Sequence, residues 1–248
     1  MGDTVAEAVV LRRRDVGEND RLLHLLTREE GIVVAVAKGS RKPGSRLAGA
    51  SEPLSASKFD LAATRYRSIV RSAQQTRTWP GLRRDYGKLA AALSLAELVD
   101  RSMPHGSPAP EVYAWLLASL APLDSADDWR IPFAWAAARL LDIEGQRPSW
   151  SRSVDHGDPL DHNPAWVSPM AGGHVPGDRH SRFADAFLAK AESLIALERL
   201  TDLEAPPPHL KFANETVVTA ARYWHGVIGS RLPATSAVVS FVSQAAGS

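Results

Sequence analysis

The stretch from Gly17 to Arg46 constrains the fold more than any other part of the chain. It contains two runs rich in branched apolar residues, Arg21–Arg28 and Ile32–Lys38, which is the composition typical of β-strands. The intervening residues are few enough for a hairpin turn and end at Gly31, which can adopt a positive φ. The sequence therefore predicts a β-hairpin here.

A basic loop follows the second predicted strand. Its sequence is KGSRKPGSR, and its glycines and proline disfavour a regular element. The four cations are Lys38, Arg41, Lys42 and Arg46. Such a loop offers positive charge and free backbone N–H groups to phosphates. The alternative interpretation is a solvated loop whose charge only keeps the protein in solution.

Three further segments complete the strand pattern, namely Ala6–Arg12, Leu54–Ala62 and Ile69–Thr76. Five short strands match the number in an oligonucleotide/oligosaccharide-binding (OB) barrel, and a closed barrel has no exposed strand edges. A small open sheet is the competing arrangement, which periodicity alone does not exclude. We predict an α+β protein with an OB-fold nucleic-acid-binding domain at residues 1–79.

Residues 80–248 are predicted to form a helical domain, because their apolar residues recur at helical spacing. The expected helices are Leu82–Met103, a helix from Pro110 that Pro122 ends, one from about Pro132 to Glu144, one capped by Ser181 with an apolar stripe from Phe183 to Ile195, and one capped by Asn214. The tail from Ala234 is expected to be loosely ordered or packed on the helices.

Residues 147–180 lack sustained periodicity and are rich in Gly, Pro, Asp, Ser and His, so we expect an irregular insertion. Its possible metal ligands are His156, His162, His174 and His180, with Asp155, Asp158, Asp161 and Asp178. Imidazole and carboxylate can bind zinc, but these spacings repeat no known ligand pattern. A polar surface loop and, less favoured, a metal-dependent hydrolase site are the two alternatives.

Charge is unevenly distributed along the chain, although the net charge is only +1. Residues 1–80 carry 14 Lys and Arg against 9 Asp and Glu, whereas residues 81–248 carry 15 against 19. A basic first third suggests a module that faces a polyanion. The second rank of candidate DNA-binding cations consists of Arg12, Arg13, Arg14, Arg21, Arg65 and Arg67, each of which could instead be a solvated surface residue.

Several classes of protein find no support in the sequence. The chain has no cysteine, which excludes disulfides, thiolate metal sites and thiol nucleophiles. It has no phosphate-binding Walker loop, nucleophile elbow or dinucleotide fingerprint, so we expect a non-enzymatic protein without catalytic residues. We see no signal peptide and no transmembrane run, and we expect a cytoplasmic location.

The order of motifs in the first third resembles a known family. The residues GENDR, LLT, the turn glycine, AVAKGSRKPGSR and Glu52-Pro53 are similar to the N-terminal domain of the bacterial RecO family of DNA repair and recombination proteins. The similarity returns at Leu95–Arg101, Ala221–His225 and Gly229–Leu232. The resemblance implies an OB barrel that contacts single-stranded DNA. It also implies that the protein anneals complementary strands and helps to load recombinase onto DNA coated by single-strand-binding protein.

The same resemblance implies partners, a location and the state of a metal site. RecR, single-strand-binding protein and recombinase are the implied protein partners, duplex DNA is a weaker ligand than single strands, and the location is the bacterial cytoplasm at the nucleoid. Many family members carry a four-cysteine zinc motif, whose positions fall here near Ser153, His156, Pro176 and Arg179. Three of these residues are poor ligands, so a degenerate site without zinc or another cofactor is expected.

The predicted barrel has few aromatic residues for base stacking, namely Phe59, Tyr66 and Trp79. We therefore expect DNA binding that depends on charge, with weak sequence preference and strong sensitivity to salt. Two alternatives remain open at this point. One is an RNA-binding module with the same barrel, and the other is a structural adaptor that binds no nucleic acid.

Overall fold

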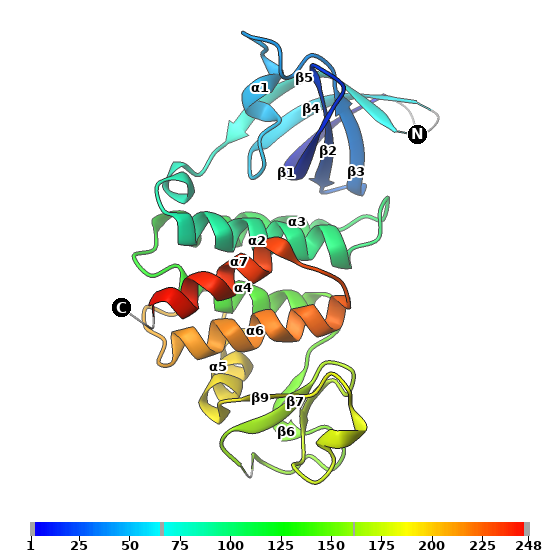
Figure 1. Cartoon of the computed structure of the whole chain (residues 1–248). Coiled ribbons are helices and arrows are strands. Elements are labelled where there is room, and N and C mark those ends of the chain that lie inside the picture. Colours follow the sequence, from blue (N-terminus) through cyan, green and yellow to red (C-terminus); the bar gives the residue numbers. More distant parts are fainter. Residues whose placement is uncertain (1–2, 65–66, 161, 246–248) are drawn as a thin grey trace. The chain divides into compact units, whose positions relative to one another are not determined.

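The computed structural model describes residues 3–64, 67–160 and 162–245. The chain comprises two compact units, Met1–Asp124 and Ser125–Ser248. The first unit contains a β-barrel and two long helices, and the second contains four helices and a small sheet (Figure 1).

All five predicted strands are present and close into a barrel, so the open-sheet alternative is wrong. The strand order is β1-β2-β3-β5-β4, with β3 and β5 parallel and the other pairs antiparallel. This is an OB-like barrel. The strands are β1 (Thr4–Val16), β2 (Asp20–Thr27), β3 (Gly31–Ala37), β4 (Ala56–Ala63) and β5 (Ser68–Arg77).

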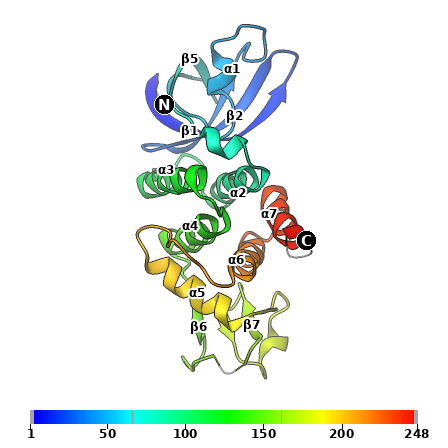
Figure 2. The same cartoon turned by 90° about the vertical axis from the view of Figure 1, so that its left-hand side faces the viewer.

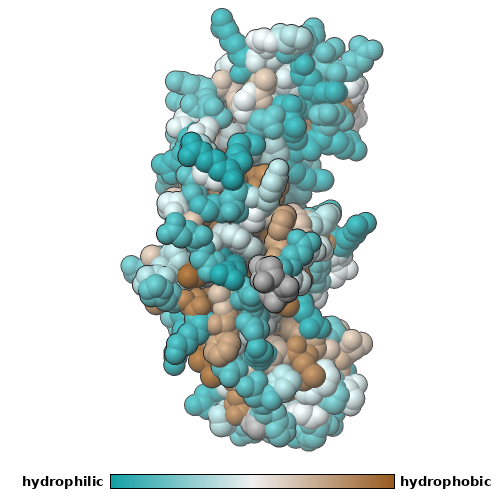
Figure 3. Space-filling model, turned by 60° about the vertical axis from the view of Figure 1, so that its left-hand side comes forward, coloured by the Kyte–Doolittle hydropathy of each residue, from teal (hydrophilic) through white to brown (hydrophobic). Residues whose placement is uncertain are grey.

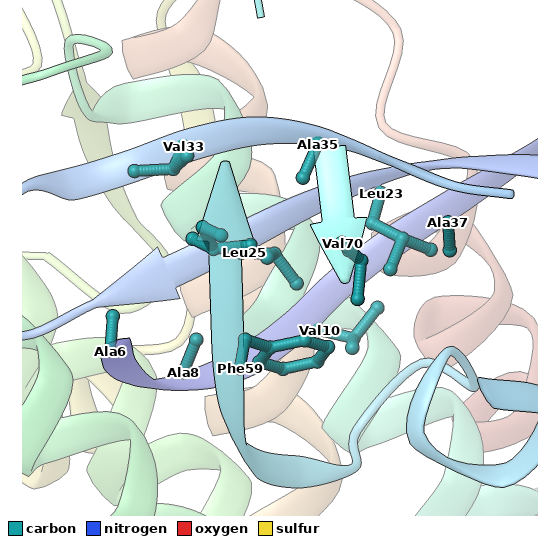
Figure 4. Packing of buried hydrophobic residues seen from close by; sticks show 11 residues of the cluster. Ala6, Ala8, Val10, Leu23, Leu25, Val33, Ala35, Ala37, Phe59 and Val70 are labelled. Atoms are coloured by element: carbon teal, nitrogen blue, oxygen red, sulfur yellow. The ribbon is translucent and has the colours of Figure 1, made fainter. Parts of the chain in front are cut away.

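The barrel interior is filled by alternate residues of each strand, as the period of two in a β-strand requires. Figure 4 shows Val10, Leu25, Phe59 and Val70 converging from four strands. Small residues, including Ala6, Ala8, Ala35 and Ala37, occupy the rest of the interior. A packed interior leaves no room for a ligand, so any binding must use the outside of the barrel.

A β-bulge in β1 redirects the arginines that follow it. Val10 pairs with Leu25, but the next pair is Arg12 with His24, which leaves Leu11 as the extra residue. Without the bulge, Arg12 would continue the inward series of Ala8 and Val10. The bulge instead places Arg12 beside His24 on the outside of the barrel.

The β2–β3 turn confirms the predicted role of Gly31. Its φ is 62°, and a Cβ at this position would lie 1.9 Å from the carbonyl oxygen of Ser107. The backbone N–H of Gly106 donates to the carbonyl of Ile32 at 3.2 Å. Gly31 is thus required both by the backbone conformation and by the close approach of the 103–109 loop.

The helices of the first unit are α1 (Leu47–Ala50), α2 (Tyr86–Ser102) and α3 (Pro110–Ser125), with a 3₁₀ turn, η1, at Pro80–Arg83. Asp85 caps α2 by accepting a hydrogen bond from the Lys88 N–H at 2.9 Å. The prediction that Pro122 ends its helix is wrong, because α3 continues to Ser125. In the last turn a proline removes only one backbone hydrogen bond, which the helix tolerates.

The helices of the second unit are α4 (Arg130–Ile143), α5 (Ala191–Asp202), α6 (Ala213–Ile228) and α7 (Pro233–Ala245). The strands of the insertion are β6 (Ser149–Ser153), β7 (Ala165–Ser168), β8 (Gly173–Val175) and β9 (Phe187–Ala189), with a 3₁₀ turn, η2, at His180–Arg182. The sheet order is β6-β8-β7-β9. The run predicted as irregular, residues 147–180, therefore contains three strands of a small sheet, and β9 follows it as the fourth. The sheet lies beside α5 in Figure 2. Its strands are too short to show a period in the sequence.

Tryptophans predicted to be core residues are buried, as expected. Trp135 and Trp224 are 3% and 0% exposed. The indole N–H of Trp135, in α4, donates to the carbonyl of Leu203, just after α5, at 2.9 Å. The indole N–H of Trp224, in α6, donates to the carbonyl of Ala137, in α4, at 3.0 Å. The two bonds tie α4 to the end of α5 and to α6. Trp115 is buried in the first unit.

Two predicted helix starts in the second unit are wrong. Ser181 lies in η2 rather than at a helix N-cap, and Phe187 belongs to β9, where it pairs with Val167. The cap of α6 is Phe212, and the side chain of Asn214 instead accepts a hydrogen bond from Arg130 at 2.7 Å. Contacts with residues distant in the sequence decide both positions, and the local sequence does not show those contacts.

Of the two arrangements expected for the C-terminal tail, the structure shows the packed one, since the tail forms helix α7 against α6. In α7, Val238 and Val242 are 0% and 3% exposed and form its packed face. Across the described ranges, no helix combines the length and apolar character that a bilayer crossing requires.

Candidate nucleic-acid interface

The basic loop between β3 and α1 is built from consecutive turns. Gly39 and Gly44 have φ values of 63° and 72°. The Gly39 N–H donates to Asp20 Oδ1 at 2.8 Å, and the Arg41 N–H donates to the Asn19 carbonyl at 2.9 Å. These bonds tie the loop to the β1–β2 turn, so its cations are held at a defined place on the barrel.

The prediction that this loop offers free N–H groups to phosphates is wrong for most of it. Besides Gly39 and Arg41, the N–H groups of Ser40, Lys42 and Ser45 donate to carbonyls of the loop or of β3. The loop therefore presents side-chain charge rather than an N–H cradle.

All four predicted loop cations are exposed, and three carry no counter-charge. Within the described ranges, Lys38, Lys42 and Arg46 make no ion pair and no side-chain hydrogen bond. Arg41 lies 3.5 Å from Asp15, through its Nε atom. Unpaired exposed cations are available to a polyanion at little desolvation cost.

A hollow on the outside of the barrel extends the basic surface beyond the loop. Its volume is about 640 Å³, and it is lined by residues that include Arg46, Lys58, Arg71 and Gln74. Arg71 is paired with Asp3 at 2.6 Å, whereas Lys58 is exposed and has no partner among the described residues. On the face shown in Figure 3 the surface of the barrel is mainly hydrophilic. Sequence reasoning missed Lys58, although its alternation with the inward Phe59 places it outside.

Three of the six predicted cations of the second rank are paired with carboxylates. Arg12 Nε lies 2.6 Å from Asp100 Oδ2, and Arg13 Nη1 lies 2.8 Å from Glu52. Arg21 lies 3.1 Å from Glu52 through Nη1 and donates to Ser51 Oγ at 2.6 Å. These side chains support the barrel, and their charges are largely neutralised.

The other members of that rank have different surroundings. Arg14 and Arg67 are exposed, and their side chains show no ion pair within the part of the chain that the structure describes. Arg65 lies outside the described residues. The structure thus brings the loop cation Arg46 together with Lys58 in one hollow, and it sets Arg12, Arg13 and Arg21 apart as paired residues.

The positions that the resemblance assigns to zinc ligands come together in the insertion. Ser153 Oγ accepts from the His156 N–H at 3.4 Å, and the Arg179 N–H donates to the Pro176 carbonyl at 3.0 Å. Arg179 pairs with Asp155, and its Nη1 lies 3.2 Å from His156 Nε2. A guanidinium here and the lack of good ligands at three positions do not fit zinc.

The remaining insertion histidines have structural partners. His180 stacks on Trp166 with ring centroids 3.9 Å apart, and His174, 2% exposed, lies 3.0 Å from the Trp166 carbonyl through Nδ1. Among the described residues, the insertion contains no group of three metal-binding side chains. His24, Asp100 and His105 form such a group in the first unit.

A closed five-stranded barrel with an exposed cationic loop on its outside belongs to the OB-like class, whose members commonly bind single-stranded nucleic acids. Residues 1–78 match the family described as Recombination protein O N terminal, and residues 83–220 match Recombination protein O C terminal. The chain therefore belongs to the RecO family.

Similar proteins agree with this assignment. The chain is 36% identical over 208 residues to DNA repair protein RecO of Heliobacterium modesticaldum, an alignment that covers 80% of this chain and 74% of that protein. It is 32% identical over 207 residues to DNA repair protein RecO of Gloeobacter violaceus, covering 83% and 79%. It is 31% identical over 151 residues to DNA repair protein RecO of Bacillus subtilis, covering 61% and 59%. The predicted class, a non-enzymatic DNA repair and recombination mediator, follows from family membership.

Proposed function

We propose that the barrel binds single-stranded DNA through Lys38, Arg41, Lys42 and Arg46. The observation that carries this proposal is the exposure of these four cations beside a packed barrel, three of them without a counter-charge within the described ranges. A phosphate backbone supplies the missing negative charge and releases its condensed counter-ions on binding.

The path of the strand continues from the loop into the hollow beside it. Arg46 belongs to the loop and also lines the hollow, where Lys58 supplies a further cation without a partner among the described residues. Neither region presents an exposed aromatic side chain among the described residues. Binding therefore depends on charge more than on base stacking, which gives weak sequence preference.

In this proposal, the DNA-binding barrel is residues 1–79, and residues 80–248 make the protein contacts. RecR, single-strand-binding protein and recombinase are the partners, and the protein acts in the RecF pathway in the bacterial cytoplasm at the nucleoid. It anneals complementary strands and helps to load recombinase, and it binds duplex DNA more weakly than single strands. Family membership supports these statements.

The test is a salt titration of binding to a single-stranded oligonucleotide. Replacing Lys38, Arg41, Lys42 and Arg46 together with glutamine removes up to four phosphate contacts. The log–log salt slope should fall by about 3, at roughly 0.7 per contact, and affinity should drop by about 100-fold or more at 0.1 M salt.

A matched control removes the same charge from exposed cations of the second unit, Arg182, Arg199, Lys211 and Arg231, whose side chains make no ion pair within the described ranges. This variant should bind nearly as tightly as the native chain. Equal losses in the two variants would mean that net charge, not the loop, controls binding. A clear preference for RNA over DNA of equal length would favour the RNA-binding alternative.

A further inference from the structure

We propose that His24, Asp100 and His105 form a binding site for a zinc-like transition-metal cation, at which the guanidinium of Arg12 is a competing cation. The three side chains come from β2, from α2 and from the loop after α2. One donor atom of each lies within 4.8 Å of the others. This inference does not depend on whether the barrel binds DNA.

Asp100 is the centre of the group. Its side chain is only 3% exposed, yet it accepts two short bonds, from Arg12 Nε to Oδ2 at 2.6 Å and from His24 Nδ1 to Oδ1 at 2.6 Å. A carboxylate so deeply buried requires a cation or strong donors to offset its lost hydration.

The contacts of His24 show which of its nitrogens a metal would use. Arg12 Nη2 lies 3.1 Å from His24 Nε2 and 3.5 Å from Nδ1, so the guanidinium lies over the face of the ring. Nδ1 lies 2.6 Å from Asp100 Oδ1, a distance at which the two atoms share a proton. A metal ion that replaces this proton would be bound by His24 Nδ1 and by the Asp100 carboxylate.

Arg12 occupies a carboxylate oxygen that a metal would use. Asp100 Oδ2 lies 2.6 Å from Arg12 Nε, and the guanidinium also covers the face of the His24 ring. The side chain of Arg12 is 52% exposed, so it can turn into solvent when a dication replaces it as the counter-charge of the buried Asp100. A dication can thus take its place with little rearrangement of the protein.

His105 supplies the third ligand from an exposed position. Its ring lies edge-on to His24, with centroids 5.4 Å apart and planes at 86°. Two imidazoles and a carboxylate with an open position form a donor set suited to Zn²⁺, Co²⁺ or Ni²⁺, and a poor one for Mg²⁺. Ligand bonds of about 2.0–2.2 Å require a small contraction, which an exposed side chain in a loop allows.

The experiment titrates the full chain with Zn²⁺ by calorimetry and with Co²⁺ by visible absorption, using the metal alone as ligand. The native chain should bind one equivalent. His105→Ala should weaken binding at least tenfold, and Arg12→Gln should strengthen it about fivefold because the competing charge is gone. His209→Ala is the matched control, because His209 is also exposed and its side chain makes no hydrogen bond or ion pair within the described ranges.

Three results would overturn the site. They are no binding by the native chain at millimolar metal, equal affinity in the native chain and His105→Ala, and an Arg12→Gln variant that binds no better than the native chain. His105→Ala and Arg12→Gln alter exposed side chains, so both should fold, which circular dichroism verifies. A purely structural role for Asp100 predicts no difference between His105→Ala and His209→Ala.

Discussion

The barrel carries two sets of cations that look alike in the sequence and differ in what surrounds them. Lys38, Lys42 and Arg46 face solvent without a counter-charge among the described residues. Arg12 and Arg13 face Asp100 and Glu52 at 2.6 and 2.8 Å. A cluster of arginines in the sequence is therefore evidence for polyanion binding only once the carboxylates that pair with it inside the protein are known.

The cause of the difference lies in the backbone. Within the described ranges, no carboxylate pairs with Lys38, Lys42 or Arg46, so nothing draws these side chains inward. The bulge after Val10 sends Arg12 outward against His24, where Asp100 of α2 meets both. The first set is available for binding, and the second set holds β1 and β2 to α2 and to the segment after α1.

The largest expected effect separates the two sets by DNA affinity. Replacing Lys38, Lys42 and Arg46 with glutamine should reduce single-strand affinity by about 100-fold at 0.1 M salt and lower the salt slope by roughly 2. In the matched triple variant, glutamine replaces Arg12, Arg13 and Arg21. Its single-strand affinity should fall less than about fivefold. Fluorescence anisotropy over a salt series measures both, and similar losses would break the comparison.

The next effect is on stability and should show the opposite ranking. Asp100→Ala removes a buried carboxylate that two side chains contact, so the free energy of unfolding should fall by about 2 kcal/mol. Asp15→Ala is the control, because Asp15 also pairs with arginines but is 53% exposed. Its cost should stay within about 0.5 kcal/mol. Urea unfolding measures both variants, and an equal cost would contradict the structural role of Asp100.

A smaller effect tests whether pairing with a carboxylate keeps the second set of cations from binding DNA. Glu52 contacts both Arg13 and Arg21, so Glu52→Gln releases two cations while keeping a polar side chain. Single-strand affinity should rise about threefold, with a slightly steeper salt dependence. Unchanged affinity in the same anisotropy assay would mean that these arginines do not contact DNA because of where they lie, and not because Glu52 pairs with them.

The smallest effect extends the comparison to a paired cation outside the barrel. A hydrogen bond from Lys190 lowers the pKa of Glu215 below its usual range. The folded state therefore binds this proton less tightly than the unfolded state, so the pair stabilises the protein above the unfolded pKa of about 4.3. That contribution is lost as the pH falls through the lowered pKa of the folded state.

Because this pair is largely solvent-screened, Glu215→Gln should cost less than about 1 kcal/mol at pH 7. The difference from the native chain should become smaller as the pH is lowered from 7 to 3. Unfolding free energies measured at both pH values provide the check. A difference that persists at pH 3 would show that the glutamine itself disturbs α6.

Particular residues show how far the sequence could lead. The barrel strands were found to within a few residues, because runs rich in branched apolar residues between turn signals are typical of strands. The loop cations were found because glycine and proline interrupt the pattern around them. Phe187 was misassigned to a helix, since its pairing with Val167 in the insertion sheet joins short strands with no visible period.

The five strands, the helical character of the remainder and the position of the basic loop could be derived from the sequence. These follow from local periodicity and composition, which act between near neighbours. Closure of the strands into a barrel and the pairing of the cations were decided by the tertiary structure. Arg12 is neutralised by Asp100 on α2, a residue that lies 76 positions beyond its other partner, His24. Charge neutralisation depends on distance in space, and no local pattern records that distance.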